Sequence, residues 1–200
     1  ARAGTGNVLA NLITGNAGSN IIDGGAGNDT MIGGSGNVVY YADSAADIIT
    51  EAYGGGTDTV HFTGVSGTYA LGANVENLFL EGTGNINGVG SAVDNLMVGN
   101  SGSNSLTGAA GNDTLDGGLG GSDTLVGGAG NDTYMVRHAG DVVDESAGGG
   151  AGIDTVQAFV SVSLLDTTHA KGTIENLTLL GTDNIDATGN AVANQLIGND

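Results

Sequence analysis

Four aspartates recur at intervals of nine or ten residues: Asp113, Asp123, Asp132 and Asp141. Each ends a turn that contains glycine and is followed, two positions later, by an apolar residue. Carboxylate oxygens and turn carbonyls are the hard ligands that Ca²⁺ prefers, with six to eight oxygens at about 2.3–2.6 Å. A single Asn-Asp turn would indicate only local hydrogen bonding. Recurrence in one register favours a cation site.

These aspartates belong to units that combine a turn with a short strand. Units 108–116, 117–126, 127–135 and 136–144 follow one another, the second with one extra residue. Glycine turns the chain because it reaches positive φ without a Cβ clash, and three extended residues follow. The pattern G-G-x-G-x-D-x-U-x resembles the RTX (repeats-in-toxin) haemolysin-type calcium-binding β-roll family. The resemblance implies an all-β fold, a parallel β-roll or β-solenoid with about 18 residues per coil.

Turns on the same side of such a coil stack about 4.8 Å apart, and one turn offers only half of a calcium ligand shell. Ion-sharing pairs are therefore expected two units apart: Asp113 with Asp132, Asp123 with Asp141, Asp132 with Asp154, and Asp29 with Asp47. Val38 stands where an aspartate is expected, which weakens the pairing of its turn with Asp58. The candidate metal ligands, aspartates and the turn residues beside them, are Gly24, Ala26, Asn28, Asp29, Asp47, Asp58, Gly108, Ala110, Asn112, Asp113, Gly117, Asp123, Gly127, Ala129, Asn131, Asp132, Asp141 and Asp154.

The repeat frame divides the chain into four segments. Residues 1–61 are expected to form a first β-roll block, in which Asn-type turns precede the calcium-type turns. Residues 62–89 read as an irregular coiled connector, and residues 90–157 as a second block with the densest calcium turns. Residues 158–200 contain a connector and the start of a further repeat. Because short sequences such as Asp-Thr-Val recur just under 100 residues apart, we expect a segment of a longer array.

The frame also predicts the core. The middle residue of each expected strand is apolar or aromatic throughout both blocks, as the inward position of a half-buried strand should be. The predicted core column is Ile13, Ile22, Met31, Tyr40, Ile49, Val60, Met97, Leu106, Leu115, Leu125, Tyr134, Val143, Val156 and Leu196.

Composition narrows the possible partners. Of 200 residues 40 are Gly, Pro, Trp and Cys are absent, and the formal net charge is −19. Few large side chains are available for a conventional core, and disulfides are excluded. Nucleic acid and anionic membrane surfaces are disfavoured because both need basic patches. A cation partner is the natural inference, and without it repelling aspartates and a Gly-rich backbone predict a largely unfolded chain.

Other chemistry has little support in the sequence. The three histidines, His61, His138 and His169, lack metal-ligand spacing and read as ordinary surface residues. Arg137 lies beside Asp141 and is expected either to pair with a carboxylate there or to stay solvated. Nucleophile, zinc-protease and phosphate-binding motifs are absent. We therefore expect no catalytic activity in this segment; any such activity is expected elsewhere in the parent chain.

The resemblance implies a secreted, extracellular or cell-surface bacterial module, exported by type I secretion and folded by calcium outside the cell. The leading hypothesis is a calcium-binding structural spacer in a larger protein. The alternative is a polysaccharide-associated module of a secreted enzyme or adhesin. A third hypothesis is end-to-end self-association, because the ends of a solenoid expose unpaired strand edges.

Overall fold

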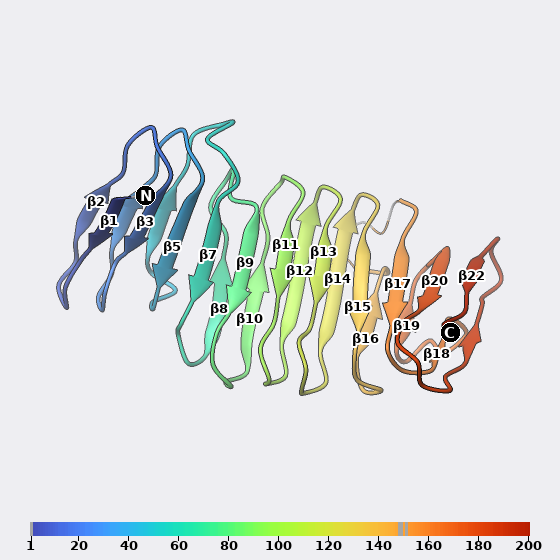
Figure 1. Ribbon diagram of the computed structural model, residues 1–200. Helices are drawn as coiled ribbons and strands as arrows, with labels where there is room; N and C mark the ends of the chain where they lie inside the picture. Colours follow the sequence, from blue (N-terminus) through green and yellow to red (C-terminus); the bar gives the residue numbers. More distant parts are fainter. Residues whose placement is uncertain (1, 148–149, 151) are drawn as a thin grey trace.

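Short parallel strands and Gly-rich turns wind the chain into a β-solenoid, with the two termini at opposite ends (Figure 1). The computed structural model describes residues 2–147, 150 and 152–200. In these residues every paired strand is parallel to its neighbour, and no helix occurs. The predicted all-β parallel solenoid is therefore confirmed. No helix capable of crossing a membrane is present in the described part of the chain.

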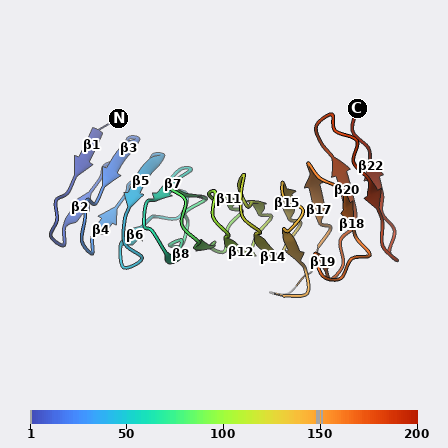
Figure 2. The same cartoon turned by 90° about the horizontal axis from the view of Figure 1, so that it is seen from below.

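One continuous sheet runs the length of the molecule and forms one wall of the coil (Figure 2). Its strands, which alternate in sequence with those of the other wall, are β1 (Arg2–Thr5), β3 (Asn20–Asp23), β5 (Val38–Ala42), β7 (Thr59–Phe62), β9 (Asn77–Leu80), β11 (Leu96–Val98), β13 (Thr114–Asp116), β15 (Thr133–Val136), β17 (Thr155–Ala158), β20 (Asn176–Leu179) and β22 (Gln195–Ile197). Strand β9 lies between β7 and β11, so residues 62–89 continue the same coil.

The other wall is divided into three sheets. The first contains β2 (Leu12–Thr14), β4 (Thr30–Ile32) and β6 (Ile48–Thr50). The second contains β8 (Gly67–Ala70), β10 (Ile86–Val89), β12 (Ser105–Ala110), β14 (Thr124–Ala129), β16 (Val142–Asp144) and β19 (Ala170–Lys171). The third pairs β18 (Val162–Ser163) with β21 (Ala187–Thr188).

Coil length follows the insertions in the repeat. Paired strands are 18 residues apart at β11 and β13 but 22 apart at β15 and β17, where residues are inserted before Asp154. Between β16 and β19 the offset reaches 27 residues, because the intervening chain makes the extra strand β18. The expected 18 residues therefore describe the regular coils, and the coil widens after residue 158.

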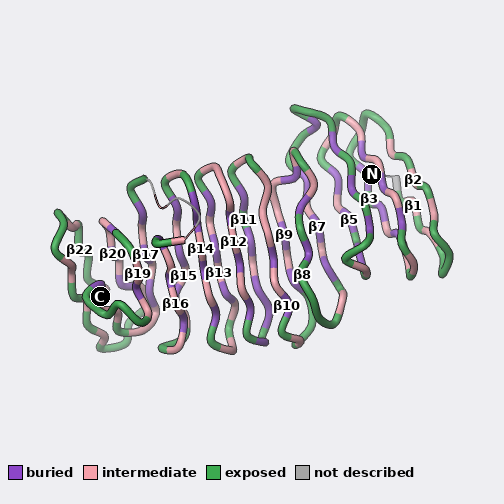
Figure 3. Tube along the Cα trace, turned by 180° about the vertical axis from the view of Figure 1, so that it is seen from behind, coloured by how far each residue is buried: buried purple, intermediate pink, exposed green. Residues whose placement is uncertain are grey.

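The core is a single column of inward-facing side chains between the walls. Buried positions run along the strands while the turn tips are mostly exposed (Figure 3). Met97, Leu106, Leu115, Leu125 and Tyr134 are fully buried, as the sequence predicts.

The core prediction is wrong only near the two ends of the solenoid. Ile13 is half-buried, and Leu196 is 45% exposed. Leu196 lies on β22, the edge strand of its sheet, so no further strand covers it in the described chain.

Candidate metal centre

The predicted turn aspartates lie in two stacked columns, one at each edge of the flattened coil. Asp113, Asp132 and Asp154 directly precede β13, β15 and β17 and form part of one column. The pairs Asp29 with Asp47 and Asp123 with Asp141 belong to the other column, before strands of the second wall. Parallel in-register stacking therefore places like aspartates on neighbouring coils.

Backbone hydrogen bonds join each expected pair. The amide of Asp113 donates to Oδ1 of Asp132 at 2.7 Å, and the amide of Asp132 donates to Oδ1 of Asp154 at 2.8 Å. The same bond links Asp29 to Asp47 at 2.8 Å and Asp123 to Asp141 at 3.1 Å. At the irregular turn, the amide of Val38 donates to Oδ1 of Asp58 at 2.7 Å. Each aspartate is thus held by the coil before it.

This ladder uses only one oxygen of most carboxylates. Oδ2 is buried and has no hydrogen-bond partner within the described chain in Asp29, Asp58, Asp113, Asp123 and Asp132. An uncompensated buried charge costs several kcal/mol, so a native structure pairs it, protonates it or binds it to a metal. The recurrence of one orphaned oxygen per turn indicates a ligand common to all these turns.

Glycine at the start of each turn leaves room for that ligand. A Cβ on Gly108 would lie 2.1 Å from Oδ2 of Asp113 and 2.8 Å from the carbonyl oxygen of Gly127 on the next coil. The gap between these two turns is therefore lined by oxygens from both. Gly24, Gly117 and Gly127 have the same relation to their own aspartates, with Oδ2 at 2.5, 2.3 and 2.1 Å from a built Cβ. These oxygen donors, charged and neutral, fit Ca²⁺.

Asp47 and Asp141 differ from the other candidate ligands. In both residues Oδ2 already accepts two amides of its own turn, from Asp43 and Ser44 and from Arg137 and His138. The cause is the turn sequence, which lacks the first glycine pair of the other units. Carboxylate oxygens that are engaged in this way have fewer lone pairs to offer a cation.

The remaining predicted ligands take other structural roles as well. Ala110 and Ala129 end strands β12 and β14, and the carbonyl of Ala129 accepts the amide of Gly111 at 3.0 Å. Side chains of Asn112 and Asn131 accept amides one coil later, at 2.9 and 2.8 Å, and form an outer ladder. Oδ1 of Asn28 lies 3.2 Å from the Ser44 hydroxyl, and Ala26 is exposed at its turn tip. Backbone carbonyls of the first glycines are therefore better placed than these residues.

Asn-type turns satisfy themselves. Oδ1 of Asn95 accepts the amide of Ser91 in its own turn at 2.6 Å, and Nδ2 donates to the Val75 carbonyl at 2.9 Å. Nδ2 of Asn104 likewise donates to the Ile86 carbonyl at 2.6 Å. An amide supplies both a donor and an acceptor, whereas an ionised carboxylate only accepts. The comparison isolates the unfilled need of the Asp-type turns.

Electrostatics support this contrast. Burial is the main cause that raises the pKa of Asp113 to about 7 and those of Asp58 and Asp123 to about 6. Burial also raises the pKa of Asp132 and Asp154. In the folded chain without metal, the charged form of these groups is thus disfavoured. A bound cation would reverse that preference.

Sequence reasoning missed four glutamates. Glu76 and Glu175 continue the ladder in place of aspartate, with Oε2 accepting the amides of Asp58 and Asp154 at 2.7 and 2.8 Å. Glu51 and Glu145 are buried inside the coil. Both stand two residues after the inward-facing middle residue of a strand, so strand alternation could have placed them inside.

The basic residues lie outside this network. Arg137 pairs with Asp116, with Nη2 to Oδ2 at 2.8 Å, and not with Asp141, because coil stacking brings Asp116 beside it. Its guanidinium also lies over the Phe159 ring, 4.8 Å from the centroid. His61 and His169 contact Glu81 and Asp166, each at 2.7 Å. Within the described residues, no histidine belongs to a group of three or more candidate metal ligands.

Comparison with known proteins agrees with the geometry. The family model described as RTX calcium-binding nonapeptide repeat (4 copies) matches residues 5–40, 89–121 and 118–133. These segments contain the turns of Asp29, Asp113, Asp123 and Asp132. A search of curated proteins found no match.

Proposed function

Because this chain carries RTX calcium-binding nonapeptide repeats wound into a parallel β-solenoid, we propose that it is a calcium-dependent rigid spacer in a larger secreted or cell-surface protein. The observation that carries the proposal is the recurring buried Oδ2 without a partner, which faces the first glycine of its turn. The calcium-binding structural role follows from the repeats; export and the spacer role are our inference.

The chain's own residues divide the work of holding the metal. First-glycine carbonyls and Oδ2 atoms of Asp29, Asp113, Asp123 and Asp132 line the gaps between turns. Oδ1 of Asp132 and of Asp154 orients the neighbouring turn through its amide. Bound calcium would supply the positive charge that these buried carboxylates lack.

Calcium-dependent folding suits a module that must leave the cell. The net charge of −19 opposes compaction when calcium is scarce, and binding free energy becomes folding free energy where calcium is plentiful. Weak sites suffice in extracellular modules, at about 10⁻⁴–10⁻³ M. The proposal assigns no catalysis to this segment and places any such activity elsewhere in the parent chain.

A distance measurement between the ends tests the spacer role. The chain has no cysteine, so Val8→Cys and Val192→Cys, both at exposed positions near opposite ends, allow two fluorophores to be attached site-specifically. In saturating calcium we expect one narrow distance distribution, because stacked coils fix the ends. With a chelator the distribution should become broad. A broad distribution that persists in calcium would rule out a rigid spacer.

A further inference from the structure

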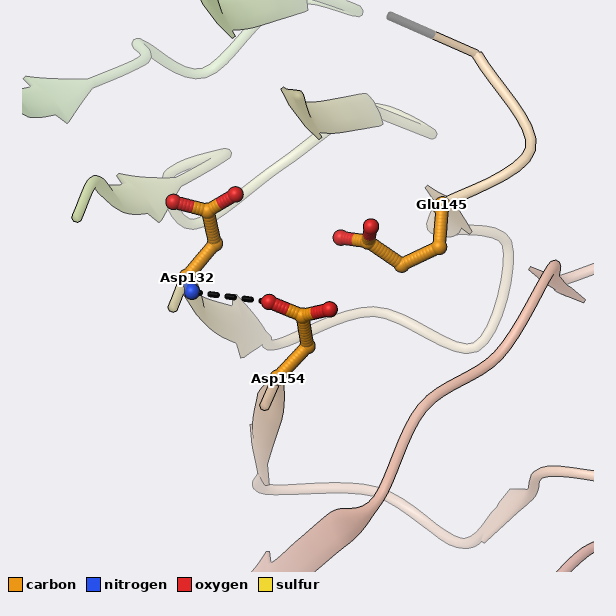
Figure 4. A group of neighbouring side chains, drawn as sticks. All are labelled: Asp132, Glu145 and Asp154. Carbon is orange, nitrogen blue, oxygen red and sulfur yellow. Dashed lines mark hydrogen bonds between the residues drawn. The ribbon is translucent and has the colours of Figure 1, made fainter. Parts of the chain in front are cut away.

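A buried acidic cluster joins the turn column to the interior of the coil. It consists of Asp132, Glu145 and Asp154, whose nearest carboxylate oxygens all lie within 4.8 Å of one another. Asp132 and Asp154 precede β15 and β17, while Glu145 follows β16 on the opposite wall (Figure 4). In the described chain this is the one such group of three acidic or histidine side chains. Glu145 and Asp154 lie outside the residues that match the repeat family.

Glu145 has no visible reason to be buried without a ligand. Its side chain points toward the two aspartates, the residue is only 4% exposed, and neither carboxylate oxygen has a hydrogen-bond partner (Figure 4). Its backbone amide is fixed by the carbonyl of Lys171 at 2.8 Å. The Lys171 ammonium instead pairs with Asp144 at 3.1 Å. Among the ion pairs of the described chain, none neutralises Glu145.

Three carboxylates in one buried space need more than a proton. One shared proton would neutralise one group and leave two charges facing each other, at a cost of several kcal/mol per buried ion. Three carboxylates together offer up to six oxygens, which is the lower end of the calcium ligand number. A divalent cation therefore matches both the charge and the ligand type of the cluster.

The first block contains a natural comparison. Tyr40, Glu51 and Asp58 stand there where Tyr134, Glu145 and Asp154 stand in the second block. In the first block the Tyr40 hydroxyl donates to Glu51, and the residue that corresponds to Asp132 is Val38. In the second block the Tyr134 hydroxyl accepts the amide of Gly127 at 2.9 Å and leaves Glu145 free. The set of three carboxylates is thus complete only in the second block.

We propose that Glu145 completes a calcium site with Asp132 and Asp154, as a ligand from the opposite wall that the nonapeptide pattern does not contain. The inference rests on the proposed calcium binding and goes beyond it. It makes this ion link the two walls of the coil, whereas turn-bound ions link neighbouring coils on one edge.

Ion counting on the full chain tests the inference. Glu145→Gln keeps the side-chain volume and removes the charge, and Glu51→Gln is the matched control at the equivalent position. Equilibrium dialysis against calcium followed by elemental analysis gives bound ions per chain, with circular dichroism as a check of folding. We expect E145Q to bind one ion fewer than wild type, and E51Q to bind the wild-type number.

The possible outcomes separate the two proposals. An unchanged ion count and affinity in E145Q would overturn the role of Glu145 and leave the calcium module intact. A wild-type chain that binds no calcium would overturn both. Should E145Q fail to fold in saturating calcium, Glu145→Asp decides: an unchanged ion count with weaker affinity supports the site, and unchanged affinity overturns it.

Discussion

Removal of calcium near neutral pH is expected to unfold the chain, and acidification is expected to restore its strands without any metal. The reason is the set of buried carboxylates whose pKa values are raised mainly by burial. The values are about 6 for Asp58 and Asp123, about 7 for Asp113 and about 8 for Glu145, against ordinary values of 3.8 for Asp and 4.5 for Glu. One pKa unit corresponds to about 1.4 kcal/mol, so several such groups outweigh ordinary domain stability.

The sign of the pH dependence follows from proton linkage. Between the unfolded and folded pKa values, the folded chain binds more protons than the unfolded chain, so stability falls as pH rises. The metal-free chain should be most stable below about pH 4 and lose that stability up to about pH 8. With calcium present the dependence reverses, because protons compete with the metal for the same carboxylates.

Far-ultraviolet circular dichroism across this pH range, with calcium or with a chelator, measures both effects. Opposite slopes of strand signal against pH in the two conditions are expected. A chelated chain with its full strand signal at neutral pH would contradict the account, because it would show that the stacked carboxylates need no cation.

Asp132→Asn is expected to be the most damaging single substitution in calcium. Asp132 is 1% exposed, accepts the amide of Asp113, donates its own amide to Asp154 and belongs to the cluster with Glu145. Asparagine keeps the shape and occurs naturally in the turns of Asn95 and Asn104, so the substitution isolates the charge. Loss of one partner from a buried ionic site costs about 3–5 kcal/mol.

The control for this prediction is Asp183→Asn, at an exposed position. Calcium titrations followed by circular dichroism should show a higher calcium midpoint for D132N and a wild-type midpoint for D183N. In chelator at neutral pH the order should reverse, because D132N buries one charge fewer. Equal calcium midpoints for the two variants would mean that the turn register is misplaced.

The turn columns could be predicted from the sequence because the repeat period alone determines which turns stack. Once Asp113 and Asp132 are two units apart, parallel pairing must bring them together, and Leu115 must pair with Tyr134. The same logic identified Val38 as an exception. Fold and ladder therefore follow from periodicity, which a single sequence displays directly.

The parts that were missed depend on side chains outside the nine-residue frame. Glu145 lies just beyond β16, and only the alternation of that strand indicates that it points inward. Arg137 was assigned to Asp141 by closeness in sequence, whereas stacking offers it Asp116. The wide coil near residues 158–188 has no periodic signal, because inserted residues do not specify the path they follow.

The central claim is that calcium ions lie between neighbouring turns of the solenoid. The most direct measurement is anomalous diffraction from crystals grown in calcium, which locates ions without reference to the protein density. The account predicts anomalous peaks in the gaps beside Gly108, between the turns of Asp113 and Asp132, and beside Asp29 and Asp123. Ordered turns without peaks at these positions would contradict it.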